Sequence, residues 1–513
     1  MATLVPVLAP APAHAAGVPR AFETQRPAWH RCDTSLPATF QCATIKVPLD
    51  YSRPDGKTLR LAISRIRTSD PAKRRGALVF NPGGPGGEGL DMPALMKPML
   101  PKDVRDRYDL VGFDPRGVGR SSPLTCGLTT TERNTEHPYH PATFDKDVTW
   151  ARTVAEKCRA KNGATLPYIT TRNTARDMDV LRAVVGAKKL SYLGYSYGTY
   201  LGAVYAQMFP ARTDRFVLDS AVDPARVWRG MIQVWAEGTE PAFARWAEWT
   251  ARHDHDYKLG DTPAKVKKAF WDLVALADRH PVDDGTGTRL TGDDIRSLLR
   301  PQFFTPKEAA RTVADLKKSA AGHPVAHPSA APHDGRPAPG AFARAAQPPA
   351  DNDSAVLWSV ICGDTAAWPH DPEQYRRDAI RDKARYPLYG DFGSAITPCA
   401  FWGKPAEPVT KVDSRVGLLT VQNQWDPQTP LTSGLGMHRA LRGSRMVYVE
   451  GGEGHGVYAG NPRLCADRTV DSYLATGKLP AHDVTCKAAP GTNSRAGQGD
   501  APVAPHSAGA PRF

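Results

Sequence analysis

The 513-residue chain lacks long hydrophobic runs, paired metal-ligand cysteines, and basic stretches interleaved with aromatic residues. Beyond residue 17 no run approaches the roughly 18 apolar residues of a membrane-spanning helix, so no integral membrane segment is expected. None of the eight cysteines forms a C-x-x-C or C-x-x-H pair, which argues against zinc. The excess of 13 Lys and Arg over Asp and Glu is scattered, which favours a solvated surface over a nucleic-acid partner. We expect neither a metal nor another cofactor.

The first residues and the cysteines both indicate export. Residues 1–17 carry no charge, are rich in Ala, and contain the small-x-small pattern Ala13-His14-Ala15 that signal peptidase cuts. We therefore expect residues 1–26 to form a leader and N-terminal segment of a secreted protein. An even number of cysteines in an exported chain indicates disulfides. Eight cysteines allow 105 connectivities, and short loops favour pairing in chain order: Cys32–Cys42, Cys126–Cys158, Cys362–Cys399 and Cys465–Cys486.

Short apolar segments bounded by turn residues predict buried strands in the first 220 residues and again after residue 415. Between two of them, helical spacing predicts a helix from Thr174, as its N-cap, to Val185. Strand–helix–strand order is typical of an α/β fold with a mostly parallel central sheet flanked by helices. The predicted strands are 76–81, 108–113, 190–194, 215–219, 416–422 and 445–450.

The middle of the chain has a different character. It is rich in Trp, Ala and charged residues at helical spacing, for example at 263–278 and 305–321, and predicts an inserted, mainly helical cap. Residues 322–354 within it are rich in Pro and Ala, so we expect a flexible loop there. The expected parts are a first core segment (27–224), the cap (225–357), a second core segment (358–487), and a disordered tail (488–513).

The segment Gly194-Tyr195-Ser196-Tyr197-Gly198 follows a predicted strand and precedes a helical segment at 199–208. A sharp strand-to-helix turn between small residues strains the central serine and lifts its hydroxyl clear of the sheet. The positive end of the following helix then lies beneath the reacting carbonyl. Ser196 is therefore the candidate nucleophile of a serine hydrolase on an α/β-hydrolase fold.

A serine nucleophile needs a base, which is oriented by an acid, and in this fold the acid precedes the histidine. His455 lies among glycines directly after the predicted strand at 445–450, and Asp426 lies in a Trp-Asp-Pro turn after the strand at 416–422. We expect His455 to be the base and Asp426 the acid. Asp219 and Asp223, after the strand that follows the nucleophile helix, remain alternative acids.

A glycine-rich loop, Asn81-Pro82-Gly83-Gly84-Pro85-Gly86-Gly87, follows the predicted strand at 76–81. It lacks the Lys-Ser/Thr pair of a phosphate-binding loop. Because a tetrahedral intermediate needs backbone N–H donors, we expect the amides of Gly84 and Tyr197 to form an oxyanion hole. We expect the loop 113–122 to be a structural turn that braces this glycine loop. Its Asp114 and Arg116 are candidates for an ion pair with each other.

Several segments in this order resemble the prolyl-aminopeptidase-like serine peptidases, and most closely the secreted bacterial tripeptidyl aminopeptidases. They are NPGGPGG, VGFDPRGVGRSSP, LGYSYGTYLG, VLDSAVDP, WDPQTP, GEGHG and the C-terminal CADRTVDSYLATGKLPAHDVTC. The resemblance covers about residues 27–487. Two departures are Glu88, where the family usually has a small residue, and Gln424-Trp425 before the acid, where a glycine is often seen.

The resemblance implies release of short peptides, tripeptides first among them, from the free N-termini of peptides or proteins. Such an exopeptidase must recognise an ammonium group, and Glu88, Glu237 and Glu240, with Glu248, are the candidate carboxylates. We expect a monomer. An esterase or lipase with the same triad, and a non-catalytic binding protein of hydrolase fold, remain alternatives.

Overall fold

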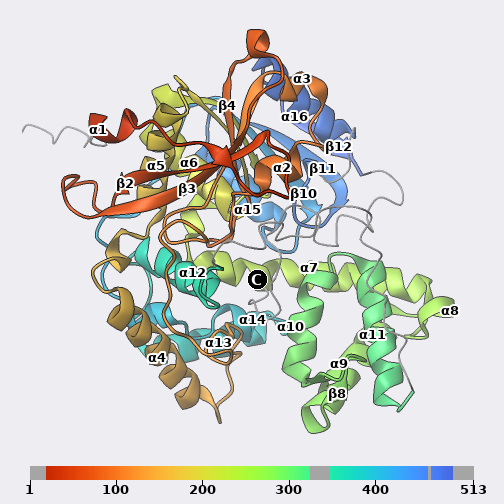
Figure 1. Ribbon diagram of the computed structural model, residues 1–513. Coiled ribbons are helices and arrows are strands. Elements are labelled where there is room, and N and C mark those ends of the chain that lie inside the picture. The colour runs from red at the N-terminus through yellow and green to blue at the C-terminus, as the bar shows by residue number, and fades with distance from the viewer. Residues whose placement is uncertain (1–18, 324–346, 460–463, 489–513) are drawn as a thin grey trace, which may run out of the picture.

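The computed structural model describes residues 19–323, 347–459 and 464–488, which form a sheet-containing part and a mainly helical part (Figure 1). Three predicted segments lie partly outside the described residues: 1–18 of the leader, 324–346 of the Pro/Ala-rich loop, and 489–513 of the tail. No helix among the described residues is both long and apolar enough to cross a membrane.

The upper part in Figure 1 is built on a ten-stranded sheet in the order β1-β2-β3-β5-β4-β6-β7-β10-β11-β12. The neighbours from β1 through β3 to β5 are antiparallel, and those from β5 to β12 are parallel. The predicted fold class is thereby confirmed. The strands are β1 (His30–Arg31), β2 (Phe40–Pro48), β3 (Thr58–Ile66), β4 (Gly76–Asn81), β5 (Tyr108–Phe113), β6 (Leu190–Tyr195), β7 (Thr213–Asp219), β10 (Leu419–Trp425), β11 (Arg445–Glu453) and β12 (Val484–Lys487).

Helices cover both faces of this sheet. On one face α5, α6 and α15 share a hydrophobic cluster with the strands, and on the other face α2, α3 and α16 share a second cluster. Because both faces are covered, β4, β5 and β6 are buried along their whole length and consist mostly of apolar residues. These helices, with the short α1, are α1 (Arg20–Glu23), α2 (Met92–Met96), α3 (Lys102–Arg105), α5 (Thr171–Val184), α6 (Tyr197–Met208), α15 (Leu431–Ala440) and α16 (Cys465–Thr476).

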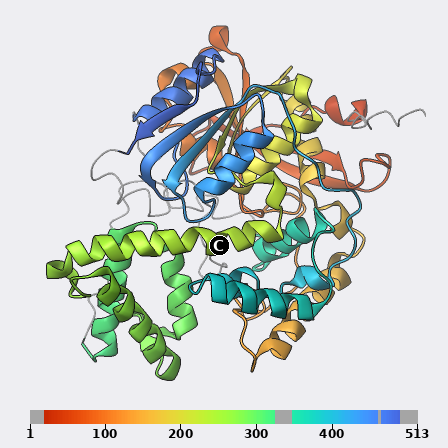
Figure 2. The same ribbon diagram turned by 180° about the vertical axis from the view of Figure 1, so that it is seen from behind.

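The second part is mainly helical and lies below the sheet, with the long helix α7 along the boundary (Figure 2). Helices α7, α9, α10 and α11 share a core of their own, rich in Phe and Trp. The elements are α4 (Phe144–Asn162), α7 (Arg229–Arg252), α8 (Asp254–Tyr257), α9 (Pro263–Arg279), β8 (Val282–Asp283), β9 (Arg289–Leu290), α10 (Gly292–Gln302), α11 (Pro306–Ala320), α12 (Asn352–Gly363), α13 (Pro372–Arg385) and α14 (Gly390–Gly393).

The predicted strands are confirmed, two of them with unchanged bounds (β4 and β5) and four with ends shifted by up to three residues. The predicted helix at 174–185 begins one turn earlier, at Thr171. Its N-cap is Thr170, whose side chain accepts from the N–H of Asn173, so the expectation that Thr174 caps the helix was wrong.

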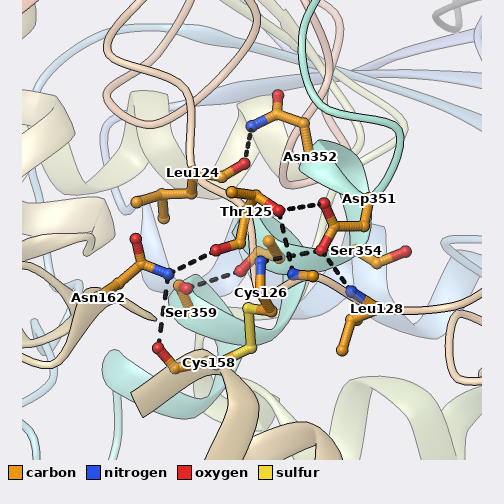
Figure 3. The surroundings of a disulfide bond; sticks show 12 residues. Leu124, Thr125, Cys126, Leu128, Cys158, Asn162, Asp351, Asn352, Ser354 and Ser359 are labelled. Atoms are coloured by element: carbon orange, nitrogen blue, oxygen red, sulfur yellow. Dashed lines mark hydrogen bonds between the residues drawn. A yellow bond between two sulfur atoms is a disulfide. The ribbon is translucent and has the colours of Figure 1, made fainter. Parts of the chain in front are cut away.

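The expectation of a flexible loop up to residue 354 was also wrong for its last residues. Asp351 and Asn352, at the start of α12, are buried (Figure 3). The Asp351 carboxylate accepts from Thr125 Oγ1 and from the N–H groups of Cys126 and Leu128, at 2.6 to 2.9 Å. Asn352 bonds the backbone of Gly117, Gly119 and Leu124. Composition alone suggested disorder, but these polar side chains are ordered by main-chain partners far away in the sequence.

The second core segment was expected to begin at residue 358, but no strand of the sheet begins there. Helix α12 is buried on all sides and belongs to the same hydrophobic cluster as the sheet, whereas the next strand of the sheet, β10, begins at Leu419. α13 and α14 lie in the helical part, where α14 packs against α7 (Figure 1). The helical part therefore draws on residues on both sides of the predicted boundary.

All eight cysteines form disulfides, and the predicted pairing in chain order is confirmed. The pairs are Cys32–Cys42, Cys126–Cys158, Cys362–Cys399 and Cys465–Cys486. Disulfides persist in oxidising compartments, so this pattern is consistent with a secreted protein.

Candidate active site

Ser196 occupies a sharp turn between β6 and α6. Its φ and ψ of 54° and −124° are a combination that residues with a side chain rarely adopt. Its N–H donates to the carbonyl of Asp219 at the end of β7 (3.1 Å), and its carbonyl accepts from Thr199 Oγ1 (2.6 Å). The strand–turn–helix context predicted for this segment is confirmed.

Close backbone packing joins the glycine loop to this turn. A methyl group on Gly198 would lie 2.6 Å from Asn81 Oδ1, and one on Gly83 would lie 2.9 Å from Ser196 Cβ. Asn81 Oδ1 also accepts from the N–H of Gly83 at 3.0 Å. Only glycine fits at these two positions, because any Cβ would separate the loop from the turn.

His455 and Asp426 lie in direct contact. The imidazole Nδ1 is 2.9 Å from Asp426 Oδ1 and 3.0 Å from Oδ2. The Asp426 side chain is fully buried, and it also accepts from the N–H of Gln428 (2.8 Å), the N–H of Thr429 (2.9 Å) and Thr429 Oγ1 (2.9 Å). A carboxylate at Nδ1 selects the tautomer whose Nε2 is free to accept a proton.

The end of β7 connects the histidine loop to the serine turn. Asp219, whose carbonyl binds Ser196 N–H, uses its carboxylate to accept from the N–H groups of Val457 (3.1 Å) and Tyr458 (2.7 Å). The next residue, Ser220, accepts from the N–H of Gly456 at 2.8 Å. The loop that carries His455 is thus anchored within one residue of the point that anchors Ser196.

Burial and charge act in opposite directions on this pair. Burial disfavours the charged form of each group, but the contact between them prevails, so the pKa of His455 is raised and that of Asp426 is lowered. The Asp219 carboxylate raises the pKa of His455 further, whereas the positive charge of Arg300 lowers it. Burial raises the pKa of Asp219 itself to about 7, although it accepts two N–H groups.

The two alternative acids hold other partners. Asp219 accepts from the amides described above, and within the described residues no hydrogen bond joins it to the imidazole. Asp223 accepts from the N–H of Ala225 (2.9 Å) and caps a short 3-10 helix, Pro224–Arg226. Asp426 is the carboxylate that the structure brings to His455.

The two amides expected to form the oxyanion hole are available. Within the part of the chain that the structure describes, neither Gly84 N–H nor Tyr197 N–H donates to a protein acceptor. Gly83 is less suitable, because its N–H already donates to Asn81 Oδ1. The Cβ position of Gly83 lies 3.3 Å from Tyr197 N, so the glycine loop approaches the first amide of α6 closely.

Sequence reasoning missed the residues that support Tyr197. Its hydroxyl pairs with Thr171 Oγ1 (2.9 Å), and its ring packs against Trp228 with a centroid distance of 5.7 Å. Both partners bond to Asp364, at the end of α12: Thr171 through its N–H and Oγ1, and Trp228 through Nε1. Burial raises the pKa of Asp364 to about 6. No sequence motif marked this aspartate, which lies 168 residues beyond Ser196.

The loop 113–122 binds the residues that follow the glycine loop, and Asp114 and Arg116 do not pair with each other. Asp114 accepts from the N–H groups of Gly89 and Leu90 (2.9 and 3.2 Å), and burial, with the nearby Glu88 charge, raises its pKa to about 7. Arg116 is buried and bonds Asp177 through two nitrogens, at 2.6 and 2.7 Å. Main-chain donors satisfy Asp114, and the buried guanidinium takes its counter-ion from α5 instead.

The candidate amine-binding carboxylates lie in different surroundings. Glu237, on α7, pairs with Arg226 Nη1 at 3.0 Å. Glu240, one turn further along α7, accepts from the N–H of Leu388 at 3.0 Å, and burial raises its pKa. Glu248 is exposed near the end of α7. Glu88 is exposed directly after the glycine loop, but partial burial of its carboxyl group raises its pKa, against the opposing charge of Arg120.

Comparison with known proteins adds a family to this geometry. Residues 76–270 match the family described as "alpha/beta hydrolase fold", and residues 386–486 match the family described as "TAP-like protein". The chain is 37% identical to the "Tripeptidyl aminopeptidase" of Streptomyces lividans, over 89% of this chain and 86% of that protein. This chain belongs to the tripeptidyl aminopeptidase family.

Other relatives of this chain carry different names. "Serine protease Hip1" of Mycobacterium tuberculosis is 30% identical, covering 89% of this chain and 90% of that protein. "Carboxylesterase B" of the same species is 33% identical, covering 94% and 95%. The match to the alpha/beta hydrolase fold and the relatives named as a tripeptidyl aminopeptidase and a serine protease show that this chain is a serine hydrolase of the peptidase type.

Proposed function

We propose that this chain is a secreted exopeptidase that releases short peptides, tripeptides first among them, from free N-termini through an acyl-enzyme on Ser196. The observation that carries the proposal is the His455–Asp426 pair, which is anchored at β7 beside the strained turn of Ser196. The printed name of the Streptomyces relative supports the tripeptide product.

In this mechanism His455 Nε2 accepts the proton of Ser196 Oγ as that oxygen attacks the carbonyl carbon of the scissile peptide bond. The N–H groups of Gly84 and Tyr197 donate to the oxyanion of the tetrahedral intermediate. His455 then gives the proton to the leaving amine as the C–N bond breaks, and an ester to Ser196 remains. Water, deprotonated by His455, hydrolyses that ester and restores the serine. Asp426 keeps the imidazole oriented and stabilises its charged form.

Recognition of a free N-terminus needs a carboxylate with access to substrate. Glu237 already pairs with Arg226, and Glu240 with a main-chain amide. Glu248 is exposed near the end of α7, whereas Glu88 is exposed directly beside the glycine loop. We infer that the carboxylate of Glu88 binds the N-terminal ammonium group of the substrate. The inserted helices act as the cap that closes the far end of the substrate site.

The test compares one peptide with a free and with an acetylated N-terminus, with products identified by mass spectrometry. We expect only the peptide with a free N-terminus to lose an N-terminal tripeptide, and we expect Ser196→Ala to abolish this reaction.

A second test concerns the substrate ammonium. The variant Glu88→Gln should lower kcat/KM for the free peptide about 10- to 100-fold, as expected for a lost charged hydrogen bond. Glu373→Gln, at an exposed site on α13, is the matched control and should retain wild-type kcat/KM.

The second candidate function is ester hydrolysis with the same triad. The relative named "Carboxylesterase B", 33% identical along almost the whole chain, is the observation that favours it. If neither peptide is cut while a short-chain ester is hydrolysed in a Ser196-dependent way, the esterase assignment replaces the exopeptidase.

A further inference from the structure

The turn that carries Asp426 is held from outside the sheet, by two inserted helices. Arg300, on α10, donates from Nη1 to the carbonyl of Pro427 (2.7 Å) and from Nη2 to Gln428 Oε1 (3.1 Å). Trp235, on α7, donates from Nε1 to the carbonyl of Gln428 (2.6 Å). Three side-chain hydrogen bonds from the helical part therefore end on the two residues that follow Asp426.

Arg300 is itself fixed in place. It is only 3% exposed, and its guanidinium lies over the rings of Trp235 (4.8 Å to the centroid) and Tyr389 (5.1 Å). Contact with two aromatic rings restricts the conformations of a long side chain, so the forked donors of Arg300 are preorganised toward the turn.

Arg300 carries a buried positive charge that no carboxylate in the described part of the chain neutralises, which is unusual for a residue whose only role is packing. Within the described residues it forms no ion pair with a carboxylate, and its Nε has no hydrogen-bond partner. Burying a cation without a counter-ion is unfavourable, and a neutral side chain would join the helices to the turn more cheaply. A buried charge retained beside a reactive group is typical of functional sites.

We propose that Arg300 is a positioning residue for the triad, which holds the Asp426 turn from the inserted helices and adds a positive charge to the surroundings of His455. The inference rests on the proposed function, because it takes His455 and Asp426 to act on Ser196. It goes further by making the helical part a contributor to catalysis as well as a cover for the substrate site.

Three charged groups act on His455, each from a different element. Asp426 follows β10, Asp219 ends β7, and Arg300 lies on α10. The two carboxylates favour the imidazolium and Arg300 opposes it, so loss of the Arg300 charge raises the pKa of His455 above its already raised value. The base is the neutral imidazole, so the acid limb of the pH–rate profile would move to higher pH.

A matched control exists on α7. Arg245 also joins the helical part to the sheet, since it pairs with Glu453 at the end of β11 and lies over the ring of Trp425. Unlike Arg300, Arg245 is not among the main charges that shift the pKa of His455. Replacing Arg245 therefore removes a comparable tie between the two parts without removing a charge that acts on the imidazole.

The experiment measures kcat, KM and the pH profile of kcat/KM on a small activated ester for wild type, Arg300→Gln, Arg300→Lys and Arg245→Gln. Active enzyme is counted by fluorophosphonate labelling, and Tm is recorded for each protein. For Arg300→Gln we expect kcat to fall about 10- to 100-fold with little change in KM, as for a displaced catalytic group. Its acid limb should move to higher pH. Arg300→Lys keeps the charge but loses the fork, so its acid limb should stay in place while kcat falls.

Two outcomes would contradict the proposed role of Arg300, and they can be told apart from failure of the proposed function. If Arg300→Gln lowers Tm but its labelled fraction has the kcat and acid limb of Arg245→Gln, Arg300 is only a packing residue and the inference is overturned. If Ser196→Ala retains wild-type turnover, the proposed function falls, and this inference falls with it. A Ser196-dependent activity with an unmoved acid limb in Arg300→Gln overturns this inference alone.

Discussion

The serine turn and the aspartate turn of the candidate triad are held by different kinds of interaction. Main-chain contacts within the sheet fix Ser196: its N–H binds β7, and the glycine loop packs directly against it. Side chains from the inserted helices hold the turn after Asp426. A site fixed by main chain tolerates no added atoms, whereas one held by side chains is adjustable by substitution at a distance.

The strongest test of this contrast is Asp426→Asn. The amide would still occupy the buried site, but it would donate where the carboxylate accepts and so disfavour the productive imidazole tautomer. We expect kcat to fall about 10⁴-fold on any substrate, by analogy with the serine proteases from which that magnitude comes. Asp223→Asn is the control for the alternative acid and should stay within about threefold of wild type. The reverse order of losses would transfer the acid role to Asp223.

A second test adds one methyl group to the main-chain side. In Gly198→Ala the new Cβ would lie 2.6 Å from Asn81 Oδ1 and 3.0 Å from the Asn81 carbonyl oxygen, which would push the glycine loop away from the serine turn. We expect kcat/KM to fall about 100-fold and the free energy of unfolding to fall by about 2 kcal/mol. Kinetics and thermal melts check both. A methyl group on Gly403 meets nothing within 4 Å, so Gly403→Ala should change neither quantity. If Gly198→Ala and Gly403→Ala have the same kcat/KM and the same free energy of unfolding, the contact between the glycine loop and the serine turn is not rigid.

The smallest expected effect is a shift in the wild-type pH profile. The carboxylates of Asp426 and Asp219 raise the pKa of His455 above its ordinary value near 6.5, despite burial. In the proposed mechanism the neutral imidazole is the base, so kcat/KM should rise with pH through a midpoint above 6.5 and then level off. Titration of kcat/KM between pH 5 and 9 measures that midpoint. A midpoint at or below 6.5 would mean that Arg300 and burial outweigh the carboxylates.

The sheet and the serine turn could be predicted from the sequence more completely than the contacts between the sheet and the inserted helices. The parallel strands and the serine turn were predictable because both depend on local signals: buried apolar segments, glycines, and a serine at a strand end. Asp351, Asp364 and Arg300 were not predictable, because their hydrogen-bond partners lie 127 to 226 residues away in the sequence. The N-cap of α5 was misplaced by one turn, because Thr170 and Thr174 carry the same capping chemistry.

The disulfides have a consequence for how this chain reaches its folded state. Each cysteine pairs with the next one along the sequence, over separations of 10 to 37 residues, and no bridge encloses or crosses another. If, as proposed, the chain is secreted and emerges N-terminus first into an oxidising compartment, both partners of each bridge are presented before the next pair appears. Pairing of each new cysteine with the nearest unpaired one already gives the native set, and little reshuffling by a disulfide isomerase is needed.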